Sequence, residues 1–183
     1  CALPISRQQM GFVPASEASP RARAAALKAL ELDSTLAEPH HMLANFRTWF
    51  EWDWAGADTA FRRAIALNQN YPDARAYYSL LLMLTGRPEQ GMAQIERALD
   101  LDPLNSFFQG IHGLDLTLMG RYDDAIAQLR KSVTMVPSHR RSLWHALHLV
   151  GTYEEALAEA RQYFAAMGHH EAAEALERGY AEA

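Results

Sequence analysis

The chain has little of several features that would point to a compartment or to chemistry. It holds one cysteine among 183 residues, so no internal disulfide can form and the cytoplasm is the expected location. No apolar run approaches the ~20 residues that cross a bilayer. A formal net charge of −5 argues against a nucleic-acid surface, which would need a basic stripe, and the cluster of Arg21, Arg23 and Lys28 is short. Neither a membrane nor a nucleic acid is expected as a partner.

Motifs for catalysis are also missing. The chain has no glycine-rich phosphate loop, no Gly-x-Ser-x-Gly, no Cys-x-x-Cys and no His-Glu-x-x-His. His145 and His148 lie three apart on a predicted helix, which makes a zinc site conceivable, but zinc needs three or four converging ligands and neither a cysteine nor a well-placed carboxylate is near. We therefore expect solvated or helix-end histidines, no catalytic residues, no metal and no cofactor.

What the chain does contain is an internal repeat. Gly86 and Gly120 lie 34 residues apart. The same offset carries further residues onto similar ones: Arg87 onto Arg121, Leu99 onto Val133, and Pro103 onto Pro137. No strand pattern competes with the helical one. A helix-turn-helix unit of this length cannot bury its apolar face alone, so it stacks on copies of itself.

The clearest copy runs from Ser106 to about Val136. It has Gly113 as a small residue of the first helix, Gly120-Arg121-Tyr122 at the turn, and Asp123-Asp124-Ala125 at the start of the second helix. This pattern resembles the tetratricopeptide repeat family. The resemblance implies an all-α fold, a right-handed superhelical solenoid of antiparallel helix hairpins. It also implies that the first helices of successive repeats line a groove for a peptide or a partner helix.

The repeat divides nearly the whole chain. We expect residues 1–6 to be a non-native or disordered stub and residues 7–183 to form the solenoid. Its parts are a partial repeat (7–36), four repeats (about 37–71, 72–105, 106–137 and 138–168) and a C-terminal helix (169–183). That helix could cap the open end or begin another repeat. The hairpin at 37–71 carries one extra residue near Trp52, which should lengthen or bulge its turn.

The first residues do not fit the repeat. Ala2-Leu3-Pro4-Ile5 matches a translated sequencing adapter, which would make the start of the chain non-native. The alternative is that Cys1 is the lipid-bearing first residue of a bacterial lipoprotein. In either case the chain is expected to be a fragment, and residues 1–6 are left out of the fold prediction.

Aromatic residues are densest around the extra residue. Trp49, Trp52 and Trp54 with Phe46 and Phe50 favour packing around the insertion, with a partly exposed recognition surface as the alternative. Two adjacent pairs, Tyr77-Tyr78 and Phe107-Phe108, should each split, because neighbouring side chains on a helix point about 100° apart. One of each pair would pack inward and the other would line the groove.

The family resemblance implies a set of groove positions on the first helices. They are His41, Asn45, Thr48 and Trp49, then Asp73, Ala76, Tyr77, Leu80 and Met83, then Phe107, Gly110, Leu114 and Thr117. These faces lack the lysines and arginines with which co-chaperone members grip a terminal carboxylate, so we do not expect chaperone-tail binding. An apolar or aromatic segment of a protein or peptide is the better expectation.

The predicted function is therefore a non-catalytic interaction scaffold. The string from Arg23 to Asp33, followed by Trp52-Asp53-Trp54, resembles repeat regions of bacterial signalling proteins and transcriptional regulators. This resemblance implies the docking or sensory part of a larger regulator. The alternative is a structural solenoid that assembles end to end into a dimer or filament, because open solenoid ends are apolar.

Overall fold

The computed structural model describes residues 15–181, and every regular element in that range is helical, with ten α-helices, a π-helix and a 3₁₀-helix. The predicted all-α solenoid of helix hairpins is confirmed. The predicted stub at residues 1–6 lies outside the described residues. The chain divides into two compact units, Cys1–Arg87 (unit 1) and Pro88–Ala183 (unit 2), and each is described by itself.

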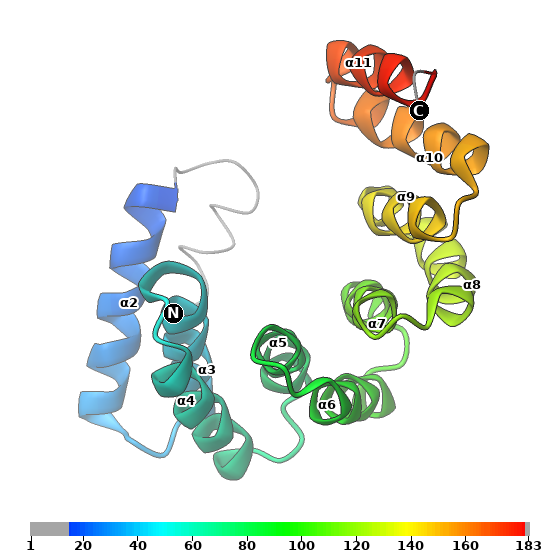
Figure 1. Ribbon diagram of the computed structural model, residues 1–183. Coiled ribbons are helices and arrows are strands. Elements are labelled where there is room, and N and C mark those ends of the chain that lie inside the picture. Colours follow the sequence, from blue (N-terminus) through cyan, green and yellow to red (C-terminus); the bar gives the residue numbers. More distant parts are fainter. Residues whose placement is uncertain (1–14, 182–183) are drawn as a thin grey trace. The chain divides into compact units, whose positions relative to one another are not determined.

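Unit 1 is a row of antiparallel helices (Figure 1). Its elements are α2 (Ala15–Leu32), α3 (Ala37–Phe46), the π-helix η1 (Arg47–Glu51), α4 (Trp54–Leu67) and α5 (Pro72–Leu84). Each α-helix packs on the next, and α3 with α4 makes the most extensive contact. Ala44, Ala57 and Ala60 let the backbones approach closely around the buried rings of Phe61 and Tyr78. Small residues at the crossings therefore set the spacing of this core.

Unit 2 continues the same hairpin pattern. Its elements are α6 (Pro88–Leu101), α7 (Ser106–Leu118), α8 (Tyr122–Val133), the 3₁₀-helix η2 (Pro137–His139), α9 (Arg140–Leu149), α10 (Tyr153–Ala166) and α11 (His170–Ala181). Successive helices pack on each other, most extensively α7 on α8 and α9 on α10. None of the helices in the described range combines the length and apolarity needed to span a membrane.

The periodic glycines end the first helix of a hairpin. Gly120 has φ +74, and Gly151 has φ +79, a backbone region that L side chains rarely adopt. After α7, the N–H of Arg121 donates to the Leu116 carbonyl (3.0 Å) while the N–H of Gly120 donates to the Thr117 carbonyl (3.0 Å). This pair of bonds is a Schellman motif, which satisfies the last carbonyls of the helix and lets the next helix start at once.

The hairpin at the corner of unit 1 ends differently. It has no glycine at this point, and Trp52 takes the left-handed conformation with φ 56. The extra residue predicted here is taken up by η1, whose i→i+5 hydrogen bonds hold one more residue per turn than an α-helix. Asp53 then caps α4 by accepting from the N–H of Gly56 at 2.9 Å. The insertion is thus absorbed in the backbone of one helix end.

Gly113 lies at the crossing of α7 and α8. A Cβ at this position would lie 2.5 Å from Leu129 Cδ2, and the Leu129 side chain is fully buried. The missing side chain therefore allows α8 to approach α7, as expected for the small residue of this repeat.

Candidate functional site

The predicted groove residues fall into two groups, nine in unit 1 and four in unit 2. Five of the thirteen are buried: His41, Thr48, Ala76, Gly110 and Thr117. The two threonines turn inward and donate to their own helix, Thr48 Oγ1 to the Ala44 carbonyl (2.9 Å) and Thr117 Oγ1 to the Gly113 carbonyl (2.8 Å). Placing these five on an open groove surface was wrong, because their side chains are covered by neighbouring groups.

His41 belongs to an aromatic core cluster in unit 1. Its Nδ1 lies 2.8 Å from the Tyr71 hydroxyl, and its ring centroid lies 5.3 Å from that of Tyr77 and 6.0 Å from that of Phe61. Burial lowers the pKa of His41 to about 4 and raises the pKa of the Tyr71 phenol. The imidazole is therefore neutral at pH 7 and serves the packing of unit 1.

The other predicted residues of unit 1 are exposed or half-buried. They are Asn45, Trp49, Asp73, Tyr77, Leu80 and Met83. Asn45 donates from Nδ2 to the His41 carbonyl at 3.2 Å, so part of its hydrogen-bonding capacity is used within α3. As contacts for a partner, these six remain a prediction.

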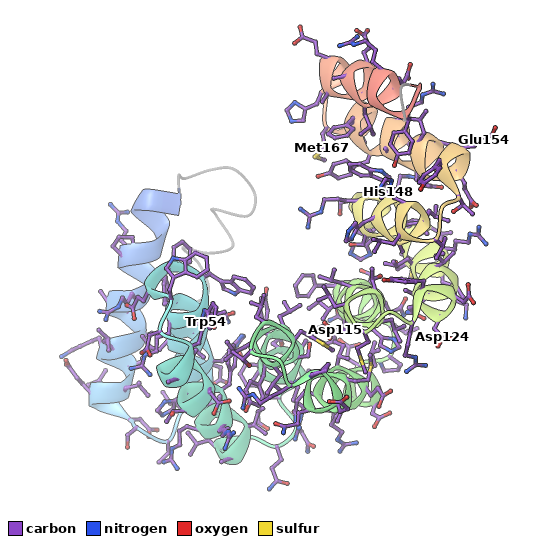
Figure 2. The ribbon with its side chains drawn as sticks, viewed as in Figure 1. Trp54, Asp115, Asp124, His148, Glu154 and Met167 are labelled. Atoms are coloured by element: carbon purple, nitrogen blue, oxygen red, sulfur yellow. The ribbon has the colours of Figure 1, made fainter. Side chains whose placement is uncertain are left out.

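The aromatic corner of unit 1 is exposed, contrary to the favoured packing interpretation. Trp49, Phe50, Trp52 and Trp54 are 39%, 53%, 68% and 41% exposed, and Trp54 begins α4 at this corner (Figure 2). Phe46 alone of the five rings is buried, with its centroid 5.6 Å from that of Phe50. Because η1 absorbs the insertion in its hydrogen bonding, there is no gap for these rings to fill.

Both adjacent aromatic pairs split as predicted. Tyr78 and Phe108 are buried, whereas Tyr77 is half-buried and Phe107 is exposed. In unit 2, Phe107 and the half-buried Leu114 are the predicted groove residues that keep an accessible side chain. Gly110 instead makes room for a neighbour, because a Cβ there would lie 2.5 Å from Cε1 of the His139 ring.

Unit 2 contains a pocket of about 390 Å³, formed by α7, α9 and α11. Its volume falls in the range of roughly 300–1,000 Å³ that ligand sites occupy. Its lining residues are Leu114, Arg141, Ser142, Trp144, His145, His148, Leu176 and Tyr180. Leu114 was the one residue of this set that sequence reasoning selected.

A signal for the remaining residues was present in the sequence. Gly120 and Gly151 lie 31 residues apart, and this offset carries Gly110, Leu114 and Thr117 onto Arg141, His145 and His148. All three of the latter line the pocket. Extending the groove positions into the shortened repeat would therefore have found them.

Hydrogen bonds fix one wall of the pocket. The Tyr180 hydroxyl accepts from Trp144 Nε1 at 3.1 Å and lies 2.8 Å from Nδ1 of His148, a residue of α9 (Figure 2). The Trp144 ring also meets Phe164 edge-on at a centroid distance of 5.8 Å. These contacts join α9 to α11 and α10, so the wall is held from two sides.

The pocket carries no signature of metal chemistry. In the described part of the chain no group of three or more His, Cys, Asp or Glu residues is placed to hold an ion. His145 and His148 share one helix face and line the same pocket, but Nδ1 of His148 is already in contact with Tyr180. The arrangement is suited to holding a bound group through shape, rings and a cation at Arg141.

No family model matches the chain, and no curated protein matches it. Solved structures do: TTC0263, described as a thermophilic TPR protein from Thermus thermophilus, is 18% identical with a TM-score of 0.78, covering 99% of this chain and 96% of that one. The fold is that of a tetratricopeptide repeat (TPR) protein. YrrB, described as a TPR protein with an unusual peptide-binding site, is 20% identical with a TM-score of 0.65, covering 92% of this chain and 88% of that one. The pilF protein of Pseudomonas aeruginosa is 25% identical with a TM-score of 0.66, covering 92% of this chain and 73% of that one. What these matches establish is the TPR fold.

Proposed function

We propose that this chain is a non-catalytic, cytoplasmic protein-interaction scaffold, the docking or sensory part of a larger bacterial regulator. The observation that carries the proposal is the pocket of unit 2, which is lined by α7, α9 and α11. These are the first helices of successive hairpins, the surfaces that the family resemblance assigns to binding. The fold match to YrrB, a protein with a peptide-binding site, supports the same class of function.

The proposal is tested by peptide selection on the whole chain. A random peptide library is panned against the immobilised protein, and selected peptides are added to ¹⁵N-labelled protein. The expected result is that the largest amide shifts within unit 2 fall on α7, α9 and α11. Selection of no peptide, or shifts confined to α8 and α10, would overturn the proposal.

A pair of variants sharpens this test. Leu114→Lys places a charge in the wall of the pocket and is expected to abolish the shifts on α7, α9 and α11. Leu104→Lys is the matched control, because Leu104 is 83% exposed just before α7 and does not line the pocket. Equal binding by both variants would argue that the pocket is not the site.

Self-assembly is the second candidate, and the exposed apolar side chains of α2 favour it. Leu27 is 40% exposed and Leu32 is 79% exposed on the first described helix of unit 1. Size-exclusion chromatography with light scattering separates the candidates. A mass near 20.5 kDa that does not change with concentration would remove self-assembly, whereas a dimer or filament would place it ahead of the docking role.

The regulatory context is tested in the native gene. We expect a long sequencing read to extend the reading frame into a winged-helix, nucleotide cyclase or Ser/Thr kinase segment upstream. A frame that holds repeats alone would contradict the regulator proposal and leave the interaction scaffold to be judged by peptide selection.

A further inference from the structure

We propose that the pocket formed by α7, α9 and α11 takes an apolar side chain, aromatic or large aliphatic, that is flanked by carboxylates in a partner peptide. This inference rests on the proposed interaction function and names the class of segment that the site prefers. It is carried by two properties of the pocket, an interior whose polar groups are already bonded to each other and a rim that presents an unpaired cation.

The interior of the pocket offers mainly apolar surface to a ligand. Leu114 and Leu176 line it from α7 and α11, and the rings of Trp144 and Tyr180 line it from α9 and α11. The indole N–H and the phenol hydroxyl bond to each other at 3.1 Å. Because these groups are satisfied within the wall, an apolar side chain can enter without stranding them.

The rim presents Arg141, which is exposed and has no ion-pair partner among the described residues. The neighbouring arginines of the same hairpin differ, since Arg140 pairs with Glu159 and Arg161 pairs with Glu177. Pairing of those two leaves Arg141 as the cation available at the mouth of the pocket.

The charge of the pocket is opposite to that of the chain. The chain has a formal net charge of −5, yet the eight lining residues include an arginine and two histidines and no carboxylate. A basic segment would find anionic surface elsewhere on the protein but would meet Arg141 at this site. Charge complementarity therefore selects an acidic segment here, and it would act on specificity more than on raw affinity.

The experiment compares three seven-residue peptides with acetylated and amidated ends, which removes any terminal carboxylate. The first has a central Phe between two Glu residues, the second has the same Phe between two Lys residues, and the third has Ala between two Glu residues. Binding to the full chain is measured by ¹⁵N chemical-shift titration at low salt. We expect the Glu-Phe-Glu peptide to bind at least fivefold more tightly than either of the others, with shifts on α7, α9 and α11.

Charge reversal provides the decisive arm. Arg141→Glu is expected to reverse the preference, so that the Lys-flanked peptide binds more tightly than the Glu-flanked one. Arg63→Glu is the matched control, because Arg63 is an exposed arginine of α4 in unit 1 and its reversal changes net charge equally. It should keep the wild-type order. If Arg141→Glu does not fold, as judged by its amide spectrum, Arg141→Gln is used and should bring the two Phe peptides to within twofold of each other.

The outcomes distinguish this inference from the proposed function. A wild-type preference for the Lys-flanked peptide, or an unchanged order in the Arg141 variant, overturns the acidic-apolar assignment. The same holds if library selection yields pocket-binding peptides that lack acidic residues, although the interaction function then stands. If neither the designed nor the selected peptides bind, both proposals fall.

Discussion

The buried imidazole of His41 should make unit 1 sensitive to mild acid. Burial lowers its pKa from 6.5 to about 4, so the unfolded chain takes up this proton at a higher pH than the folded one. The stability that comes from the neutral imidazole is therefore complete above pH 6.5 and is lost as the pH falls towards 4. A shift of this size corresponds to about 3 kcal/mol in full, and to about 2 kcal/mol at pH 5.

The loss is measured by urea unfolding at pH 7 and pH 5, followed by tryptophan fluorescence. Trp49, Trp52 and Trp54 lie in unit 1, so the signal reports mainly on that unit. Carboxylates also titrate over this range, and comparison with His41→Gln removes their contribution. We expect the wild type to lose about 2 kcal/mol more between the two pH values than this variant loses.

The matched control is the adjacent exchange His40→Gln. His40 is half-buried beside His41 on α3, and its variant should keep the wild-type acid loss. If the His41→Gln protein loses as much stability between pH 7 and pH 5 as the wild type, the buried imidazole does not control the acid response and the reasoning is refuted.

Two further predictions concern the backbone. Gly113→Ala should lower the free energy of unfolding by about 1–3 kcal/mol, because its Cβ would meet buried Leu129 at 2.5 Å. Gly179→Ala, where a Cβ meets nothing within 4 Å, should instead be neutral or raise stability by up to about 1 kcal/mol; thermal melts check both, and equal shifts would show the crossing is not tight. Trp52→Gly should stabilise the protein by about 1 kcal/mol, because φ 56 strains a non-glycine residue; a lower urea midpoint would mean that the ring contributes more than the strain costs.

The solenoid fold could be predicted because its turns depend on backbone conformation. Glycine is the residue that readily adopts the positive φ seen at Gly120 and Gly151, so the turn positions are visible as a spacing in the sequence. The extra residue near Trp52 was visible for the same reason. Its form was not, because a longer loop and a π-helix both accommodate one more residue.

The groove was harder to predict, because helical periodicity tells which residues share a face and not how deeply that face is covered. Thr48 and Thr117 share a face with accessible residues, yet each bonds to its own helix and is buried. The pocket was missed because the repeat that begins near residue 138 is three residues shorter, so the 34-residue offset does not reach Trp144 or His148.

The π-helix at η1 shows how a repeat protein can tolerate a change of length. An added residue inside an α-helix would rotate everything after it by about 100° and turn its buried face away from the core. Confined to Arg47–Glu51, the same residue leaves the buried face of α4 in contact with α3. Hairpin ends are thus the places where this chain can gain residues without refolding. The corner beside Trp52 is accordingly a natural position at which to insert an epitope tag.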